Sequence, residues 1–314
     1  FVNMIRLFVR LLMLALGFSL LAPSGNVLAQ VAPTSSTASA GDKVELFHAD
    51  SLVVLNVPGQ VVRKLHNNVR LRHKGVLMYC NLAVQNVTMN IIEAYGNVRL
   101  IQGDTISVKG DTMFYYGSTR QANMRGHVTM RDRKMTLTTA QLDYNMVSGI
   151  AHYPTPGRIV DKENTLTSRE GYYDTRTKLF TFRRNVRLVN TKGILTADSL
   201  LYNSTSRIAT FQGPTRITNK DGVLTAIAGQ YNTTTGISNF ERRATVETPK
   251  YRLTGDSLYY DNATELGIAK GKVIMVAKDQ KAVILGDHVR YNGKIGISRV
   301  TGHAVAKSIG NEAS

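Results

Sequence analysis

The chain has 314 residues, of which 43% are hydrophobic and 19% charged, with a mean hydropathy of −0.14. This composition is too apolar for a disordered chain and too polar for a multi-span membrane protein. The 39 Lys and Arg residues outnumber 22 Asp and Glu, so the net charge of +17 favours an anionic partner: a nucleic acid, a membrane surface or a phosphorylated ligand. The single cysteine, Cys80, excludes a disulfide framework and a cysteine-rich zinc site.

Residues 1–29 have the pattern of a signal peptide. Two arginines precede an apolar run of 12 residues, Leu11 to Ala22. A bilayer span takes about 20 residues, so this run is too short to cross a membrane and fits a signal sequence. Cleavage is expected after Ala29, with an uncleaved anchor as the alternative. We expect a protein exported to the periplasm, with residues 30–43 as a linker and 308–314 as a tail.

A 29-residue repeat dominates the rest of the chain. Stretches such as GDTMFY and ADSLLY recur, each ending in tyrosine, at positions 115, 144, 173, 202, 231, 260 and 291. The spacings are 29, 29, 29, 29, 29 and 31 residues. Two weaker copies precede them, with Val54 and Val84 in the tyrosine position. The pattern predicts nine units over residues 44–307.

Each unit has a second element near its middle, of the form G-x-V. GNVRL (96–100), GHVTM (126–130) and GKVIMV (271–276) are examples. Val, Ile, Thr and Tyr alternate with polar residues in both elements, which is typical of β-strands, and Asn or Asp residues supply turn chemistry. The sequence therefore predicts two short strands per unit, with a turn after each.

The alternation assigns a face to each residue. In ADSLLY, Asp198, Leu200 and Tyr202 are predicted to share the inward face, while Ser199 points outward. A stack of such units cannot bury its apolar face alone, so it is expected to fold over itself as an elongated all-β sandwich or jelly roll. Aromatic residues make up only 7% of the chain, and we expect the interior to stay partly open.

The stretch GNVRLIQGDTISVKGDTMFYY (96–116) resembles the signature of the OstA-like family. That family includes the periplasmic bridge protein of lipopolysaccharide transport and the N-terminal domain of the outer-membrane translocon. The resemblance extends over roughly residues 44–307. It implies an open, V-shaped β jelly roll whose inner trough holds lipid acyl chains. It also implies assembly end to end, or with related jelly-roll components of the lipopolysaccharide export machinery.

The predicted lining of this trough combines the inward aliphatic positions with the repeat tyrosines. The residues are Val98, Met113, Tyr115, Val128, Leu142, Tyr144, Val186, Leu200, Tyr202, Ile217, Tyr231, Val246, Leu258, Tyr260, Val273, Val289 and Tyr291. Core packing without lipid contact is the alternative interpretation of the tyrosines.

Other recurring residues are interpreted structurally. A catalytic carboxylate pair occurs once in a protein, whereas the aspartates here recur in register, so a role at a turn or strand end is expected. They are Asp111, Asp198, Asp256 and Asp287. The seven histidines are scattered and suggest no metal site, and Cys80 is expected to be a small apolar strand residue. No enzyme motif and no cofactor site is predicted.

The basic charge is spread beside the G-x-V elements. It comes from Arg99, Arg131, Arg133, Arg184, Arg187, Arg216, Arg242, Arg243, Lys270 and Lys272. Export and the absence of a basic-aromatic cluster argue against nucleic acid as the partner. Lipid A carries phosphates and acyl chains, which an apolar trough with a basic rim would match. The alternative is that the charge only solubilises the outer face.

The leading hypothesis is a non-enzymatic periplasmic protein that binds lipopolysaccharide and delivers it towards the outer membrane. A structural β-solenoid or adhesin without a lipid ligand is the first alternative, and a carbohydrate-active enzyme on a β-helix is the second. The two-strand period and the lack of a unique acidic cluster argue against the enzyme. Unpaired strands at both ends of the array are expected to drive head-to-tail self-association.

Overall fold

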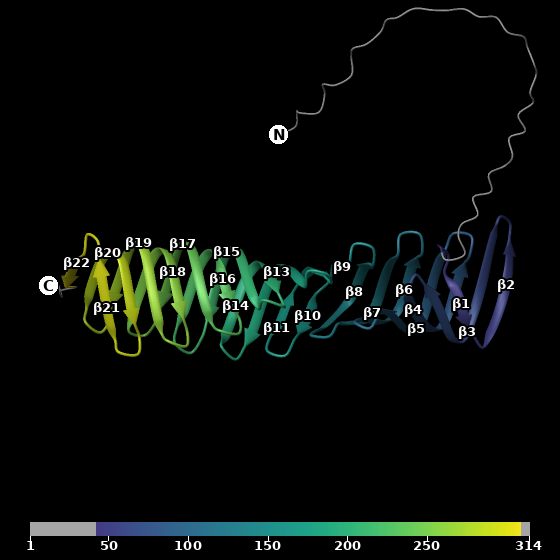
Figure 1. Ribbon diagram of the computed structural model, residues 1–314, viewed down its shortest axis with the longest axis horizontal. Coiled ribbons are helices and arrows are strands. Elements are labelled where there is room, and N and C mark those ends of the chain that lie inside the picture. Colours follow the sequence, from purple (N-terminus) through teal and green to yellow (C-terminus); the bar gives the residue numbers. More distant parts are fainter. Residues whose placement is uncertain (1–41, 309–314) are drawn as a thin grey trace, which may run out of the picture. The chain divides into compact units, whose positions relative to one another are not determined.

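The computed structural model describes residues 42–308, which form 22 antiparallel strands and no α-helix (Figure 1). The predicted signal peptide (1–29), nearly all of the linker (30–43) and nearly all of the tail (308–314) lie outside the described residues. Within residues 42–308, no helix is long and apolar enough to cross a membrane.

The strands follow one another with short turns between them. They are β1 (Glu45–His48), β2 (Ser51–Val57), β3 (Gln60–His73), β4 (Val76–Asn86), β5 (Ile91–Gln102), β6 (Ile106–Tyr116), β7 (Gln121–Arg131), β8 (Thr136–Asn145), β9 (Ile150–Tyr153), β10 (Gly157–Val160), β11 (Thr165–Ser168), β12 (Glu170–Asp174), β13 (Leu179–Asn190), β14 (Gly193–Asn203), β15 (Ile208–Thr218), β16 (Val223–Asn232), β17 (Ile237–Glu247), β18 (Tyr251–Asp261), β19 (Leu266–Ala277), β20 (Ala282–Asn292), β21 (Ile297–Thr301) and β22 (Val305–Ser308).

Four long strands are interrupted near their middle and appear as the pairs β1/β2, β9/β10, β11/β12 and β21/β22. When each pair is counted as one strand, the 22 strands become 18, or nine units of two. Each long strand pairs with its neighbours in sequence, so one continuous ladder runs from β1/β2 to β21/β22. The predicted all-β, elongated repeat fold is confirmed.

The long strands bend near their middle, and each contributes one half to each of two layers. Layer A contains the second halves of β3, β5, β7, β13, β15, β17 and β19, the first halves of β4, β6, β8, β14, β16, β18 and β20, and the short strands β1, β10, β11 and β22. Layer B contains the remaining halves with β2, β9, β12 and β21. We call the line of bends the hinge, and the opposite edge, where the strand ends of the two layers meet, the mouth.

Pairs of left-handed residues lie at the bends of β3, β5, β7, β13, β17 and β19. In β5, Gly96 (φ 71°) and Asn97 (φ 51°) are both left-handed, and the ladder with β6 shifts register between Tyr95 and Val98. Glycine adopts this conformation at little cost, which explains the first letter of the G-x-V element. Because pairing resumes beyond the bend, the element lies in the middle of one long strand. The prediction of two strands per unit, each followed by a turn, is confirmed, but the strands are longer than the short runs predicted, and the G-x-V element is a bend within one of them.

The bend also changes which residues face inward. In β14, Leu195 is buried before the bend and Leu200 after it, while Asp198 and Ser199 are both exposed. The prediction that Asp198 shares the face of Leu200 was therefore wrong, because the strand turns between them and its alternation shifts by one residue. In β4 the buried equivalent of the repeat tyrosine is Gln85, not the predicted Val84.

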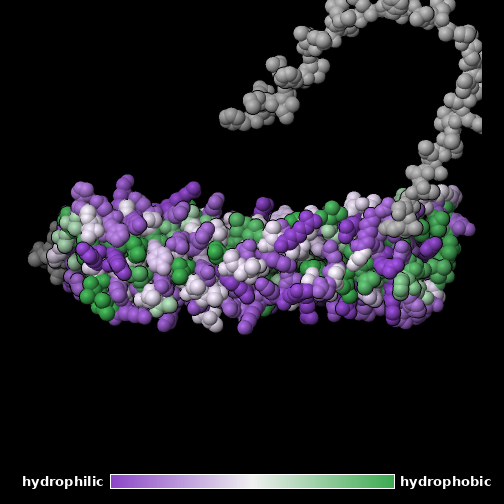
Figure 2. Space-filling model, in the orientation of Figure 1, coloured by the Kyte–Doolittle hydropathy of each residue, from purple (hydrophilic) through white to green (hydrophobic). Residues whose placement is uncertain are grey.

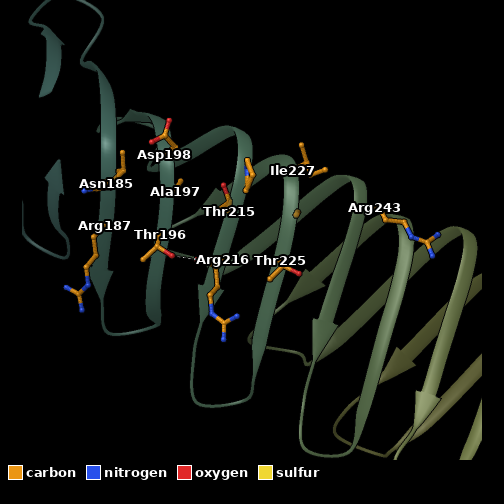
Figure 3. A pocket seen from close by; sticks show the side chains of 13 residues that line it. Asn185, Arg187, Thr196, Ala197, Asp198, Thr215, Arg216, Thr225, Ile227 and Arg243 are labelled. Carbon is orange, nitrogen blue, oxygen red and sulfur yellow. Dashed lines mark hydrogen bonds between the residues drawn. The ribbon is translucent and has the colours of Figure 1, made fainter. Parts of the chain in front are cut away.

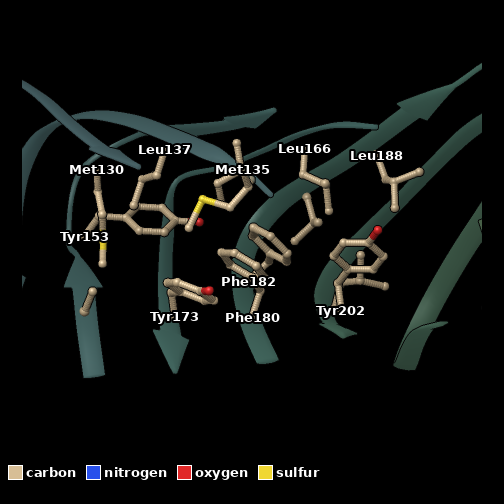
Figure 4. Packing of buried hydrophobic residues seen from close by; sticks show 14 of the residues in the cluster. Met130, Met135, Leu137, Tyr153, Leu166, Tyr173, Phe180, Phe182, Leu188 and Tyr202 are labelled. Atoms are coloured by element: carbon tan, nitrogen blue, oxygen red, sulfur yellow. The ribbon is translucent and has the colours of Figure 1, made fainter. Parts of the chain in front are cut away.

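Side chains from the two layers pack against each other between hinge and mouth (Figure 4). At the centre of the body, Leu166 and Leu188 of layer A lie opposite Tyr173, Phe180 and Phe182 of layer B. The Phe180 ring stacks on Tyr173 at 4.1 Å and on Phe182 at 5.6 Å between centroids. The composition predicted an interior short of bulky aromatic groups. The centre of the body differs from this expectation, because the chain concentrates its few rings here. This central part is closely packed.

The bends predict unequal effects for two glycine substitutions. Gly126 (φ 72°) in β7 and Gly75 (φ 79°) in the β3–β4 turn are both left-handed, so alanine at either position costs roughly 1–3 kcal/mol of backbone strain. A Cβ at Gly126 would also collide with the carboxylate of Asp111, whereas one at Gly75 meets nothing within 4 Å. We expect Gly126→Ala to lower the midpoint of thermal unfolding more than Gly75→Ala, as followed by circular dichroism. Equal shifts would contradict a structural role for the close packing at the hinge.

Candidate functional site

All of the predicted lining residues are buried between the two layers. Their exposed fractions run from 0% for Tyr115 to 9% for Tyr291. The valines beside the bends, such as Val98 and Val186, line layer A near the hinge. The leucines and tyrosines, such as Leu200, line layer B, with the tyrosines nearest the mouth. The structure thus brings them together in one continuous apolar cluster that extends through the units.

The repeat tyrosines reach across the mouth to polar residues at the strand ends of layer A. The hydrogen-bonded pairs are Tyr115 OH with His73 Nδ1 (2.7 Å), Tyr144 OH with Gln102 Oε1 (2.5 Å), Tyr173 OH with Asp132 Oδ2, and Tyr202 OH with Asp161 Oδ2 (3.1 Å). In each pair the partner precedes the tyrosine by 41 or 42 residues. We call these contacts, and others that join the two layers at the same edge, the mouth bridges.

The carboxylates of the two central bridges are deeply buried. The side chain of Asp132 is 5% exposed and lies 3.4 Å from Lys178 Nζ, and that of Asp161 is 1% exposed and pairs with Arg207. Burial alone would raise the pKa of Asp132. Hydrogen bonds from Tyr173 and the backbone, together with the Lys178 ammonium, outweigh this effect and hold the pKa below the ordinary value of 3.8. The bridge therefore contains a carboxylate at neutral pH.

At the N-terminal end, the bridge between Tyr115 and His73 is uncharged. Burial raises the pKa of Tyr115 to about 12, so its hydroxyl keeps its proton. Burial also lowers the pKa of His73, so its ring is neutral at pH 7. A neutral ring accepts from Tyr115 at Nδ1 and donates from Nε2 to the Asp42 carbonyl oxygen, 3.2 Å away.

Further contacts continue the closure of the mouth. They are Val44 N to Asn90 Oδ1 (2.8 Å), Asn190 Nδ2 to the Thr233 carbonyl oxygen (3.3 Å), Asn219 Nδ2 to Asn262 Oδ1 (3.2 Å), and the rings of Tyr251 and Tyr291 with centroids 4.4 Å apart. Within residues 42–308, no backbone–backbone hydrogen bond crosses the mouth. The layers are held together at this edge by contacts that each involve a side chain.

The sequence analysis missed the layer A partners of the tyrosines. His73, Gln102, Asp132, Asp161, Asn190 and Asn219 stand 29 or 30 residues apart, at the ends of alternate long strands. Their chemical variety concealed this second periodicity. A search for any polar residue at the repeat spacing, without regard to type, would have found them.

The recurring aspartates lie at the hinge rather than at turns or strand ends, which corrects their predicted position. Asp111 Oδ2 lies 2.7 Å from His127 Nδ1, and Asp287 Oδ2 lies 2.7 Å from His303 Nδ1. In each case the histidine belongs to the left-handed bend of the following long strand. The aspartates occur in mid-strand because the strands are longer than the sequence pattern predicted.

Metal-ligating side chains and the single cysteine were the remaining candidates for reactive groups. No three His, Cys, Asp or Glu side chains within it are grouped so that they could hold a metal ion. Cys80 is buried, and burial raises the pKa of its thiol to about 11, which keeps it protonated and unreactive.

The family model described as OstA-like protein matches residues 41–198 and 182–256. The chain belongs to the OstA-like family. This confirms the resemblance found in the sequence, and it is a transport and binding family whose members are in general periplasmic. In this OstA-like protein, residues 257–308 continue the same bends and ladder beyond the match.

The solved structures and curated proteins add nothing to this assignment. Hsv2p of Kluyveromyces lactis is 8% identical with a TM-score of 0.16, over 82% of this chain and 99% of that chain. Hsv2 of Kluyveromyces marxianus is 7% identical with a TM-score of 0.15, over 78% of this chain and 97% of that chain. Such low scores carry no argument about fold or function. No curated protein matches the chain.

The mouth bridges predict that one buried carboxylate stabilises the fold more than an exposed one. Asp132→Asn keeps the size of the side chain but leaves Lys178 without its counter-charge. We expect the free energy of unfolding to fall by roughly 1–3 kcal/mol at neutral pH. Asp104→Asn is the control: Asp104 pairs with Arg133 but is 80% exposed, so the loss of stability should stay within about 1 kcal/mol. Denaturant unfolding measures both.

The pH dependence of this difference follows from the depressed pKa of Asp132. A carboxyl whose pKa is lower in the folded protein stabilises the fold fully above its unfolded pKa, near 3.8. That stabilisation is lost as the pH falls through the folded value. The difference in free energy of unfolding between the wild-type protein and Asp132→Asn should therefore disappear in acid. A difference that stayed constant with pH would show that charge is not involved.

Proposed function

We propose that this OstA-like protein binds lipopolysaccharide in the periplasm and delivers it towards the outer membrane, holding the acyl chains between layers A and B without catalysing a reaction. The observation that carries the proposal is the unequal closure of the apolar interior. Continuous backbone joins the two layers at the hinge, whereas contacts that involve side chains join them at the mouth. An acyl chain could enter there without breaking a single ladder hydrogen bond.

The free energy needed to open a mouth bridge is comparable with the free energy gained by burying part of an acyl chain. A hydrogen bond between side chains contributes about 0.5–1.5 kcal/mol net, which is the cost of opening one bridge. Each methylene moved from water into an apolar interior gains about 0.8 kcal/mol. A long acyl chain therefore offsets the opening of several bridges, provided that the layers move apart to receive it.

The mouth is closed less firmly in the C-terminal half than at the centre, and we propose the C-terminal half as the side of entry. The bridges with buried carboxylates are at Asp132 and Asp161, and beyond them the polar bridges are made by the amides of Asn190 and Asn219. Further on, Tyr260 is 8% exposed, and no described residue of layer A forms a hydrogen bond with its hydroxyl. An amide bridge has no charge pair to separate, so it opens at lower cost.

A photo-crosslinking residue at Leu200, compared with one at Ser199, tests this proposal. Leu200 is 2% exposed between the layers, and Ser199 is its exposed neighbour in β14. Delipidated protein is incubated with labelled lipopolysaccharide and irradiated. We expect capture at Leu200 and not at Ser199, because the two side chains lie on opposite faces of layer B. Uptake without this contrast would refute the site, and no uptake at all would favour a structural solenoid without a lipid ligand.

Delivery also requires neighbours, and the ends of the body supply a surface for them. Within residues 42–308, β1 and β2 pair only with β3, and β21 and β22 pair only with β20. In β2, Leu52, Val54 and Val57 are 45–49% exposed, and hydrophobic side chains gather at this end of the body (Figure 2). An unpaired apolar strand of this kind can accept a strand from another jelly roll or from a second copy.

We expect head-to-tail self-association that Val54→Lys weakens. A lysine on the edge strand introduces charge where a second copy would pack. Light scattering over a concentration series should show growing oligomers for the wild-type protein and fewer for Val54→Lys. Val147→Lys is the control, since Val147 is a similarly exposed valine, 54%, in the turn between β8 and β9 and away from both ends. A loss of association in both variants would point to non-specific contacts.

A further inference from the structure

The outer faces of the two layers differ in charge. From Ser107 to Thr225, the outer face of the layer A strands carries Lys109, Arg131, Arg158, Arg187 and Arg216 and no carboxylate. The outer face of layer B mixes both signs. It carries acidic residues such as Glu93, Asp143, Glu170, Asp174 and Glu241, and basic residues such as Arg125, Arg183 and Lys270. A surface that only keeps a protein soluble mixes the signs, as layer B does.

Arginine and threonine alternate across the strands of layer A. The register joins Thr138 to Arg158, Arg158 to Thr167, Thr167 to Arg187, Arg187 to Thr196, Thr196 to Arg216, and Arg216 to Thr225. We call these seven residues the Arg–Thr ladder. It crosses β8, β10, β11, β13, β14, β15 and β16 in spatial order and runs along the long axis of the body. Adjacent strands are about 4.8 Å apart, so the arginines repeat roughly every 10 Å.

The ladder forms one wall of a groove on the outside of the hinge. Arg187, Thr196, Arg216 and Thr225 line a pocket with a volume of about 720 Å³, and in Figure 3 they lie in a row over neighbouring strands. Thr138, Arg158 and Thr167 line a second pocket of about 510 Å³. The two pockets share Asn185, so they lie next to each other along the seven ladder residues.

The groove carries an excess of positive charge. Besides the ladder residues, Ala197, Ile227, Arg243 and one exposed carboxylate, Asp198, line the larger pocket. Arg158, Arg187 and Arg216 are exposed, and no carboxylate among the described residues lies within ion-pair distance of them. The Thr138 hydroxyl donates to the Arg158 carbonyl oxygen at 3.3 Å, which leaves its lone pairs free to accept from a ligand. The wall therefore offers charged donors and hydroxyl acceptors in alternation.

From this arrangement we infer that the Arg–Thr ladder binds an extended anionic polysaccharide, lying along the groove with an acidic group on every second sugar. In an extended pyranose chain each sugar advances by about one strand spacing, so such acidic groups would meet successive arginines. Sugar hydroxyls both donate and accept, which matches the threonines between them. The site lies on the outside of the hinge and does not depend on lipid binding between the layers.

Other polyanions fit this surface less well. Phosphates of a nucleic acid strand repeat about every 3.4 Å, and single strands are usually bound by stacking on aromatic rings, which the seven ladder positions lack. A membrane surface requires apolar side chains that insert beside the basic ones. The seven ladder positions hold only arginine and threonine.

The inference is tested by fluorescence anisotropy on the full chain with a labelled hyaluronan decasaccharide, which carries one carboxylate on every second sugar. We expect the wild-type protein to bind it and not a neutral maltooligosaccharide of equal length. The triple variant Arg158→Gln, Arg187→Gln, Arg216→Gln should raise the Kd about tenfold or more, because three charge-assisted contacts are lost. The probe has no acyl chain, so the result is independent of the proposed lipid site.

A second triple variant controls for net charge. Lys270→Gln, Arg290→Gln and Arg299→Gln remove the same three charges from the exposed face of layer B, and the Kd should change by no more than about twofold. Circular dichroism confirms that both variants fold. Absent hyaluronan binding, or equal losses in the two variants, would overturn the inference. So would tighter, ladder-dependent binding of a single-stranded oligonucleotide or of phosphatidylglycerol vesicles.

Discussion

The bend in the middle of each long strand is the constraint on which the other features depend. Left-handed residues such as Gly96 and Asn97 in β5 turn the backbone without ending its pairing, and the neighbouring strands bend with them, so every long strand belongs to both layers. The layers are therefore continuous at one edge and separate at the other. The burial of the aliphatic and tyrosine positions, the location of the mouth bridges and the outer groove all follow from this geometry.

The interior between the layers is not uniform along the body. Rings of Tyr173, Phe180 and Phe182 stack at its centre, where the chain also places its buried carboxylate bridges. Rings also lie in the flanking units, such as Phe211 with Phe240 and Tyr251 with Tyr291, but among the described residues no buried carboxylate bridge closes the mouth there. This centre is the most firmly closed part of the molecule. A lipid that passed along the whole body would have to displace these rings, whereas the flanking units could open alone.

The repeat allowed much of the fold and the inward face to be predicted, because a 29-residue period fixes which positions are equivalent. Leu200 and Val186 are buried as alternation requires, since each lies within one half of a bent strand. The prediction failed for Asp198 because alternation does not continue through a bend, and nothing in the letters AD at residues 197 and 198 marks a change of layer. The polar partners recur at the repeat spacing, but the sequence does not show that they pair with the tyrosines. Tyr173 and Asp132 are 41 residues apart, and their contact depends on how the layers close.

A body built in this way can change its length without changing its design. Each unit contacts its neighbours through the same ladder, and each bridge links one unit to the unit before it. Duplication of one 29-residue segment would therefore insert a new bend, a new inward tyrosine and a new polar partner together, in register with the rest. The span would grow by roughly 10 Å per duplication, the width of two strands. Selection could thus set the reach of such a protein by tandem duplication, with no compensating change in its core.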